Sequence, residues 1–309
     1  MEKIYDFSEI LAEYNRSPQE YINICEEAFH RELKKVADSL CLNDDRRDVL
    51  LISGPSSSGK STSANIIRGY LFDKGIDSQS LSTDDFFYNK EEMPVHQAGF
   101  DFESPTIVNE LLLLDKVNEL LSRGEAYIPR YDFFSGKKVY KSKKEKLSKN
   151  GVVIVEGIHA LNNSVIEMGP EIDTVRAYVS VSSKINVDGR IVSGRTLRMA
   201  RRIIRDNKFR ANDLDKTLTM WQSVCDGEDK YIRPYKKTAD FVIDTLLPYE
   251  PLMLSGEMLE LLINSGNKHN DNRRISDLLW IYTHCNGGNL DLIPKDSVLR
   301  EFVSGGIYG

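Results

Sequence analysis

The chain has 309 residues, 40% of them hydrophobic and 28% charged, which are values typical of a globular protein. Its formal net charge of −6 gives no general electrostatic reason to bind nucleic acid or an anionic membrane. No apolar run approaches the roughly 20 residues of a membrane span, and the N-terminus lacks the apolar core of a secretory leader. The four cysteines lie far apart without a CxxC pair, which favours reduced thiols and a cytoplasmic protein.

Residues 1–47 are predicted to form a helical N-terminal extension. In "SPQEYINICEEAFHRELKKVADSL" the apolar residues recur at helical spacing, and the Ser-Pro start suits a first helical turn. The polar stretch "NDDRRD" at 43–48 closes this region.

From Val49 to about Thr245, short apolar runs alternate with longer amphipathic ones. The predicted strands are 49–53, 78–82, 151–156, 174–181 and 239–244, and the predicted helices are 60–73, 106–123, 184–207 and 213–225. Such alternation is typical of an α/β fold with a doubly wound parallel sheet and helices on both faces. We therefore expect one core domain over 48–247, followed by a mostly helical C-terminal extension over 248–309 that packs on it.

The stretch "VLLISGPSSSGKSTSA" at 49–64 contains the spacing GxxxxGK[ST] of a phosphate-binding P-loop. Glycines let backbone N–H groups approach phosphate oxygens, and the helix after the loop directs its positive end at the same anion. Lys60 can neutralise the β- and γ-phosphates, and the Ser61 hydroxyl can ligate Mg²⁺. An ordinary Ser/Gly turn is the alternative, but a strand before the loop and a helix after it favour nucleotide binding. The predicted nucleotide-binding residues are Gly54, Ser56, Ser57, Ser58, Gly59, Lys60, Ser61 and Thr62.

Three carboxylates come directly after or at the end of predicted strands. Asp84 and Asp85 come after the strand 78–82, so they should emerge at the carboxyl edge of the sheet beside the phosphates. A carboxylate there can accept a proton from an acceptor hydroxyl or help to hold Mg²⁺, although either aspartate can also be a helix N-cap. Glu156 ends the apolar strand of "VVIVEGIHAL", where it can act on Mg²⁺ or its water.

The segment "RTLRMARRIIRDNKFR" is dense in arginine and predicts a lid at about 195–212 that closes over phosphates. Guanidinium groups can stabilise the charge on a transferring phosphoryl group. A solvated basic face with some RNA-binding capacity is the alternative. The Lys-rich segment 136–149 is likewise interpreted as a solvated β-ribbon or loop rather than a nucleic-acid patch. The arginines are Arg195, Arg198, Arg201, Arg202, Arg205 and Arg210.

The motifs together resemble the uridine kinase/phosphoribulokinase-like P-loop kinases. "GPSSSGKST", "STDDFF", "FDFESP", "PRYDF", "VVIVEGIHAL" and "RMARRIIRD" occur in that family's order and spacing. The strongest likeness is to the uridine-kinase-like domain of long bacterial proteins that carry an N-terminal TGS-type region. It includes the tail "LIPKDSVLREFVSGG" and spans roughly residue 48 to the end. The 47-residue N-terminal part is too short to hold such a region, so that function is not carried over.

The resemblance implies roles for individual residues. Asp84 would be the general base, Asp101 would hold ribose hydroxyls, and Tyr131 would lie near the nucleobase. Phe87 takes the position of the family's substrate-site tyrosine, Asp85 that of a serine, and Glu156 that of the Mg²⁺-associated acid. The matching lid arginines are Arg202, Arg205 and Arg210. Lys60, Arg202 and Arg205 would assist catalysis, Arg205 would also reach the substrate, and Arg210 would bind the nucleotide.

Three positions depart from the family pattern. Gly136 stands where uridine kinases place a histidine that reads the pyrimidine, Asn212 replaces a lid arginine, and Met220 replaces a glutamine. Losing a hydrogen-bonding side chain removes a contact that discriminates one base from another. The sequence therefore supports the reaction class more firmly than the acceptor.

The expected function is an ATP- and Mg²⁺-dependent kinase that phosphorylates a small-molecule hydroxyl, foremost that of a uridine- or cytidine-like nucleoside. The alternatives are the same chemistry on a sugar, polyol or vitamin alcohol, a nucleotide-dependent switch or RNA-associated protein, and a non-catalytic scaffold. The acidic chain disfavours nucleic acid as a partner and no membrane partner is expected, whereas the two extensions leave a homo-oligomer open.

Overall fold

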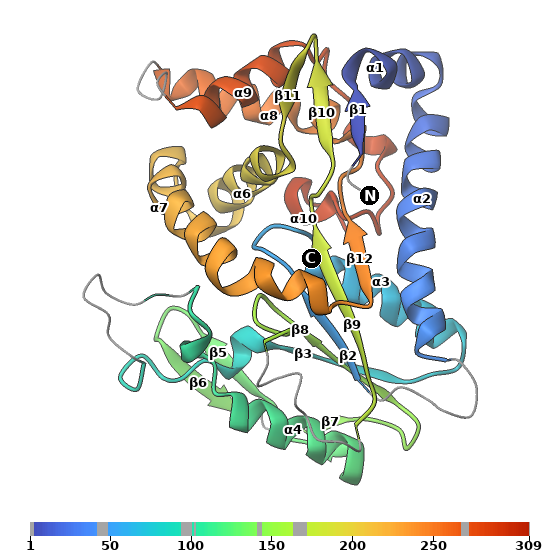
Figure 1. Ribbon diagram of the computed structural model, residues 1–309, viewed down its shortest axis with the longest axis vertical. Coiled ribbons are helices and arrows are strands. Elements are labelled where there is room, and N and C mark those ends of the chain that lie inside the picture. The colour runs from blue at the N-terminus through green and yellow to red at the C-terminus, as the bar shows by residue number, and fades with distance from the viewer. Residues whose placement is uncertain are drawn as a thin grey trace.

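The computed structural model describes residues 3–41, 49–93, 101, 103–140, 144–162, 172–266 and 272–308. Its centre is a five-stranded sheet in the order β3-β8-β2-β9-β12, in which every neighbouring pair is parallel (Figure 1). The strands are β2 (Val49–Ser53), β3 (Ser78–Ser82), β8 (Val152–Glu156), β9 (Thr174–Ser180) and β12 (Phe241–Asp244), so all five predicted strands are confirmed. In this order β3 and β8 lie on one side of β2, and β9 and β12 lie on the other. The connections therefore diverge at the carboxyl end of β2, where a doubly wound sheet has its binding crevice.

Both faces of the sheet are covered. In β2, Leu50 and Ile52 join one buried apolar cluster, whereas Val49 and Leu51 join the other, as the alternation of a strand requires. The larger cluster includes residues of α2 (Pro18–Ser39), α3 (Lys60–Asp73), α6 (Gly194–Arg210), α7 (Leu214–Gly227), α8 (Glu250–Asn264) and α9 (Arg273–Thr283). The smaller cluster includes α4 (Glu110–Arg123). This is the doubly wound α/β architecture of P-loop kinases.

Two short ribbons accompany α4 at one end of the molecule (Figure 1). One pairs β4 (Glu125–Ala126) with β7 (Glu145–Lys146), and the other is a hairpin of β5 (Pro129–Asp132) and β6 (Lys137–Tyr140). The Lys-rich segment 136–149 thus contributes β6 and β7, which confirms the interpretation as a β-ribbon for the part that is described. Residues 141–143 of this segment lie outside the described residues.

The helix predicted over 184–207 is wrong in its first part. Residues Lys184–Val187 form β10 and Arg190–Val192 form β11, an antiparallel pair, and α6 begins only at Gly194. The turn between them is Asp188-Gly189, with φ of 49° and 85°. An Asp-Gly pair with two positive φ values is a strong hairpin turn, and it outweighs the helical periodicity around it.

The N-terminal extension is not purely helical. Residues Ile4–Asp6 form β1, which pairs in parallel with β10, and α1 (Phe7–Arg16) comes next with Asp6 as its N-cap. A three-residue strand leaves no periodic signal in the sequence, because its place is set by a partner about 180 residues away. The polar stretch 43–48 lies outside the described residues.

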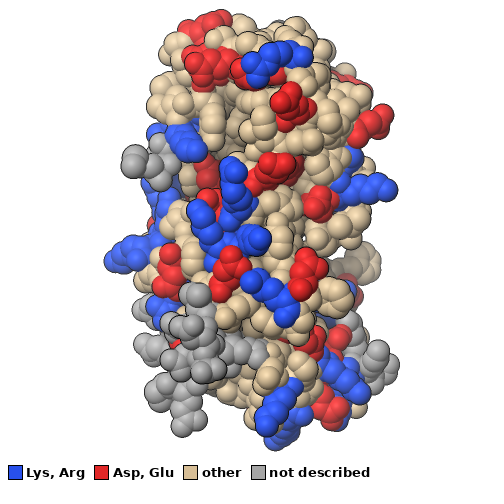
Figure 2. Space-filling model, turned by 90° about the vertical axis from the view of Figure 1, so that its right-hand side faces the viewer, with Lys and Arg blue, Asp and Glu red and all other residues tan. Residues whose placement is uncertain are grey.

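The C-terminal extension is helical only in part. After α8 and α9 it contains a turn of 3-10 helix at Leu290–Leu292 and the short α10 (Arg300–Val303). On the face that Figure 2 shows, basic and acidic side chains of the described residues are interspersed. Among the described residues, no helix is long and apolar enough to cross a membrane.

A buried ion pair fixes α6 to the start of α8. Arg201 donates to both carboxylate oxygens of Glu250 at 2.6 Å, and to the Thr245 carbonyl at 2.6 Å. Both charged side chains are almost completely buried. Thr245 in turn donates its hydroxyl to the Ser58 carbonyl at 2.8 Å, so the network ends on the P-loop.

Replacing Arg201 by methionine should lower the free energy of unfolding by about 3–5 kcal/mol, because the Glu250 carboxylate stays buried without a partner. Urea denaturation followed by circular dichroism measures this change. Lys35→Met is the control, since the Lys35–Glu32 pair is exposed and should contribute about 1 kcal/mol or less. Equal losses in the two variants would contradict the role of the buried pair.

Candidate active site

The loop between β2 and α3 is held in a conformation that requires glycine. A Cβ on Gly59, whose φ is 86°, would lie 2.3 Å from a methyl group of Val298. A Cβ on Gly54 would lie 1.9 Å from the Val179 carbonyl oxygen. The loop is therefore packed against β9 on one side and against the C-terminal segment on the other. Lys60 begins α3, and its amine donates to the Pro55 carbonyl at 3.0 Å.

A cavity of about 150 Å³ opens on this loop at the carboxyl ends of β2 and β8. It brings together predicted residues from the P-loop, from the ends of β3 and β8, and from the arginine-rich helix α6. The sequence predicted that these parts would meet. We call it the phosphate cavity. Its lining residues are Ser56, Ser57, Gly59, Lys60, Ser61, Asp84, Glu156, Gly157, Ile158, Arg205, Arg210 and Glu301. Gly54, Ser58 and Thr62 belong to the loop but do not line the cavity.

The charges in the phosphate cavity depend on one another. Burial raises the pKa of Glu156 to about 7, while Lys60 opposes this shift. Burial also raises the pKa of Asp84, again against the attraction of Lys60. Conversely, burial lowers the pKa of Lys60, and Glu156 and Asp84 act against that shift. The side chains thus form a compact group of one cation and two carboxyls.

Oxygen donors in this cavity suit Mg²⁺. The Ser61 hydroxyl and the carboxyls of Asp84 and Glu156 line it together, and hard oxygen ligands are what Mg²⁺ takes in combination with phosphate oxygens. The neighbouring Asp85 has a different part: it accepts the backbone N–H of Tyr131 at 3.1 Å and so fixes β5. The two adjacent aspartates are therefore separated in function, Asp84 lining the cavity and Asp85 supporting the fold.

The arginines of α6 converge on Ser56. Arg198 donates to the Ser56 carbonyl at 2.7 Å, and Arg202 and Arg205 donate to its hydroxyl at 3.1 and 3.2 Å. Arg198 also pairs with Glu228. Arg210 is about half exposed and lines the phosphate cavity together with Arg205.

Two arginines predicted for the lid lie in the interior. Arg198 and Arg201 are only 1% and 0% exposed, and both are bound to acidic partners from other elements. They fix α6 against the P-loop and α8, whereas Arg205 and Arg210 are the arginines that reach the cavity.

Of the residues predicted for the acceptor, Arg205 lines the phosphate cavity, whereas Asp101, Tyr131 and Phe87 are not among its lining residues. Tyr131 and Phe87 are buried and pack edge to face, with ring centroids 5.5 Å apart, and Phe133 packs on Tyr131 at 5.1 Å. Gly136 is a turn residue of the β5–β6 hairpin with φ of 67°, and a Cβ there would lie 2.9 Å from Cβ of Lys90. A histidine would be strained at this position, which explains that departure from the family pattern.

Glu103 was not predicted from the sequence. Asp101 accepts the Glu103 N–H at 3.0 Å, so it shapes the local turn. Oε2 of Glu103 is buried and has no hydrogen-bond partner among the described residues. Burial raises the pKa of Glu103 to about 7, and Arg202 and Lys60 are the cations that oppose this shift most. Lys60 thus acts on Glu103 as it acts on Asp84 and Glu156 of the phosphate cavity.

His159 was not predicted either. It is 1% exposed, its Nε2 has no partner among the described residues, and burial lowers its pKa to about 4. The imidazole is therefore neutral. Both residues stand inside quoted motifs, "FDFESP" and "VVIVEGIHAL", but only the fold shows that they are buried close to Lys60.

The fold and this site define a P-loop kinase, and comparison with known proteins identifies the family. Residues 49–249 match the phosphoribulokinase / uridine kinase family. The chain therefore belongs to that family. The further likeness to TGS-containing proteins stays a prediction.

Two curated relatives show how far the similarity extends. Uridine kinase-like protein 5 of Arabidopsis thaliana is 29% identical over 200 residues, which cover 63% of this chain and 38% of that protein. The uridine kinase of Staphylococcus aureus (strain JH9) is 27% identical over 203 residues, which cover 63% of this chain and 86% of that protein. The match thus spans well under half of the Arabidopsis protein and most of the bacterial one.

The fold is also similar to that of solved structures. A protein described as a candidate fructose transport system kinase, from Silicibacter sp. TM1040, aligns with a TM-score of 0.50 at 15% identity. The alignment covers 68% of this chain and 98% of that one. The likeness is one of fold.

Replacing Glu103 by glutamine should change how stability depends on pH. A carboxyl whose pKa is raised by folding, here from 4.5 to about 7, is favourable below the lower value and becomes costly as pH rises through the higher one. The melting temperature of Glu103→Gln relative to the native chain should therefore be higher at about pH 8 than at about pH 5. Thermal unfolding at the two pH values measures this, with the exposed Glu32→Gln as the control. A difference that does not change with pH would show that Glu103 is not buried as a carboxyl.

Proposed function

We propose that this chain is an ATP-dependent kinase that transfers the γ-phosphoryl group to a hydroxyl of a uridine- or cytidine-like nucleoside. The observation that carries the proposal is the phosphate cavity, which joins the P-loop lysine and Ser61 with Asp84 and Glu156. The family membership and the names of the curated relatives support it. Each group in the cavity has a part in phosphoryl transfer.

The donor phosphates would lie on the backbone N–H groups of the loop 54–61, with Lys60 at the β- and γ-phosphates. Mg²⁺ held by Ser61 and Glu156, with Asp84 beside it, supplies charge neutralisation when it is bound. Arg205, with Arg202 behind it, adds positive charge toward the transferred group. The loop and the arginines are already in place, so little reorganisation is needed.

Asp84 would act as the general base. It takes the proton of the acceptor hydroxyl while that oxygen bonds to the γ-phosphorus, and the bond between the γ-phosphorus and the β–γ bridging oxygen breaks to release ADP. Asp84 lies just after β3, in the 3-10 turn Thr83–Phe86, so its position is set by the sheet. This fixed position supports a role in proton transfer.

The acceptor would lie against Asp101, Tyr131 and Phe87, and we add Glu103 because of its buried oxygen near Arg202. The segment predicted as a lid, 195–212, is mostly the helix α6, which Arg198 and Arg201 already fix against the P-loop and α8, so we propose no closing motion for it. A non-pyrimidine acceptor, such as a sugar, polyol or vitamin alcohol, is the second candidate. Gly136 favours it, because the turn there has no room for the histidine that reads a pyrimidine.

The native chain should release ADP from Mg²⁺-ATP when uridine or cytidine is supplied. Asp84→Asn should lower kcat by roughly 10²–10⁴-fold while the dissociation constant of ATP stays within about threefold, since the base acts only in the chemical step. A coupled ADP assay across nucleosides, ribose, polyols and pantothenate measures turnover, and calorimetry measures binding. Turnover with a non-pyrimidine acceptor alone would show that the proposed acceptor is wrong, while the proposed mechanism would stand. ATP binding without turnover on any acceptor would refute the small-molecule kinase.

Asp101→Asn and Glu103→Gln separate the two acidic residues of "FDFESP". If one of the two side chains contacts the acceptor, its substitution should raise the KM of the acceptor roughly tenfold without changing ATP binding. We expect the larger effect at Glu103, whose buried Oε2 has no hydrogen-bond partner among the described residues, while the Asp101 carboxylate already accepts a backbone N–H. Steady-state kinetics at saturating ATP give both values. An unchanged acceptor KM in both variants would exclude this turn from the acceptor site.

A further inference from the structure

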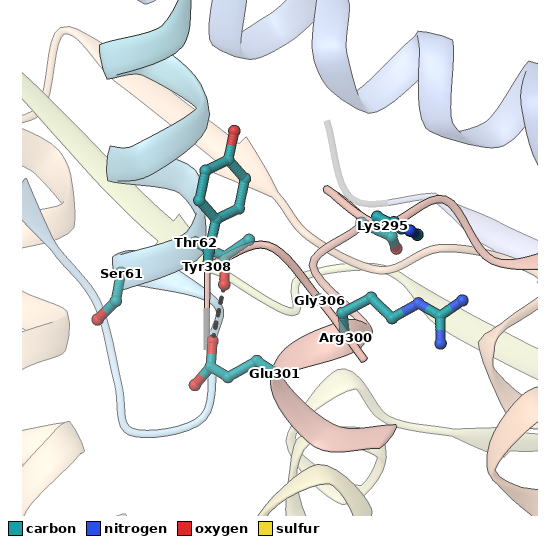
Figure 3. A pocket seen from close by; sticks show the side chains of 8 residues that line it. Ser61, Thr62, Lys295, Arg300, Glu301, Gly306 and Tyr308 are labelled. Atoms are coloured by element: carbon teal, nitrogen blue, oxygen red, sulfur yellow. Dashed lines mark hydrogen bonds between the residues drawn. The ribbon is translucent and has the colours of Figure 1, made fainter. Parts of the chain in front are cut away.

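A second cavity, of about 140 Å³, lies beside the P-loop. Ser61 and Thr62 of α3 form one wall, and the C-terminal segment 294–308 forms the rest (Figure 3). Ser61 and Glu301 line this cavity and the phosphate cavity alike, so the two are adjacent. The remaining residues of the second wall are Lys295, Ser297, Arg300, Gly306 and Tyr308. All of them lie beyond residue 249, where the match to the family ends.

The charged groups set the direction in which a nucleotide would lie. In a P-loop the lysine contacts the β- and γ-phosphates. Lys60, Asp84 and Glu156 line only the phosphate cavity, so they mark its γ end. The ribose and the base must therefore leave the loop on a different side.

Packing restricts that exit. Val298 lies against Gly59, and the guanidinium groups of α6 cover Ser56. The second cavity, in contrast, is adjacent to the phosphate cavity and shares Ser61 and Glu301 with it. The second cavity therefore lies where the sugar and base of a nucleoside triphosphate would extend from the bound phosphates.

We propose that the segment 294–308 forms the nucleoside subsite of the phosphate donor, a ribonucleoside triphosphate. The inference rests on the proposed function in that a nucleotide occupies the P-loop. It adds that the sugar and the base are held by residues outside the part that matches the family. Glu301 binds ribose hydroxyls, and Tyr308 flanks the base.

The chemistry of Glu301 fits a sugar. Its Oε1 accepts from Arg205 at 3.1 Å, and its Oε2 accepts from the Thr62 hydroxyl at 3.3 Å. Figure 3 shows its side chain directed from α10 at Thr62. Arg205 balances the negative charge, so a carboxylate is tolerated next to phosphates. A carboxylate only accepts hydrogen bonds, and ribose hydroxyls are the donors that stand between the phosphates and the base.

Tyr308 supplies a flat surface for the base. Its hydroxyl lies 4.0 Å from where a Cβ on Gly69 would be, so its ring runs along α3 from the P-loop end. Tyr308 is still 36% exposed, which leaves area for stacking. Stacking of a base on an aromatic side chain contributes to the affinity for a nucleotide.

The segment is held firmly enough to serve as a binding wall. Arg300 donates to the carbonyls of Leu290 at 3.1 Å, Ser304 at 3.2 Å and Ile293 at 2.5 Å. Leu299 and Phe302 are fully buried, and the Phe302 ring lies 5.2 Å from the Arg201 guanidinium. Such pre-organisation lowers the entropy cost of binding.

The test is equilibrium binding of three probes to the full chain with Mg²⁺: ATP, 2′,3′-dideoxy-ATP and inorganic tripolyphosphate. Tyr308→Ala should weaken ATP roughly tenfold and leave tripolyphosphate unchanged, because tripolyphosphate has no base. Glu301→Gln should reduce the preference for ATP over the dideoxy analogue, which lacks both ribose hydroxyls. Phe72→Ala, a 78% exposed aromatic residue on α3, is the matched control and should change none of the three affinities. Melting temperatures verify that the variants are folded.

Each other outcome overturns the inference in a recognisable way. Equal loss of ATP and tripolyphosphate in Tyr308→Ala would mean that the segment only supports the phosphate loop. Unchanged ATP binding in both variants, or equal affinity of the native chain for ATP and tripolyphosphate, would exclude a nucleoside contact and leave the kinase proposal intact. If the native chain bound neither ATP nor tripolyphosphate, the proposed function would fail together with the subsite.

Discussion

The close packing of the loop 54–59 is the constraint on which the rest of the structure depends. A phosphate-binding loop must leave its backbone N–H groups free for the anion, so it cannot be stabilised by the usual backbone pairing. Here contacts from outside replace that pairing. Gly54 abuts the Val179 carbonyl, Gly59 abuts Val298, and α6 binds Ser56 through three arginines. Parts of the chain more than 100 residues away in sequence therefore determine the shape of the loop.

The same contacts explain why so many charges are buried around a small cavity. Arg201 is neutralised by Glu250, Arg198 by Glu228 and Arg205 by Glu301, so α6 can present a dense row of guanidinium groups without accumulating unpaired charge. Lys60, Asp84, Glu156, Arg205 and Arg210 line the cavity. Arg198 and Arg201 hold the helix in place, while the cavity itself keeps the groups that phosphoryl transfer uses.

Local signals allowed the sequence to predict the strands and the loop. The strand β2 is a continuous apolar run, and the P-loop is a fixed spacing, so neither depends on distant residues. The β10–β11 hairpin also has a local signal, the turn pair Asp188-Gly189. The prediction missed the hairpin because the helical periodicity of the arginine-rich segment was extended back over it. By contrast, β1 needed a distant partner strand to be recognised.

The site shows the same division between local and distant information. Asp84 and Glu156 could be predicted because a residue at the end of a parallel strand must emerge at the sheet's carboxyl edge. Which acid of "FDFESP" faces the arginines depends on one turn, in which the Asp101 side chain accepts the Glu103 N–H. Glu301 was given no role from the sequence, because its place beside Thr62 results from the course of the C-terminal segment across α3. Residues whose position depends on tertiary contacts have no characteristic spacing in the sequence by which they could be predicted.

The two ends of the site are consequently built by different means. At the donor end, Val298 of the segment 294–308 packs against Gly59 of the P-loop, and Glu301 of the same segment accepts a hydrogen bond from Arg205. At the acceptor end, the hairpin β5–β6 turns at Gly136, whose positive φ and closeness to Lys90 exclude a branched or aromatic side chain. A pyrimidine could therefore not be recognised by a side chain at position 136. Glu103 is a candidate for discriminating between acceptors, because its buried Oε2 has no hydrogen-bond partner in the part of the chain that the structure describes.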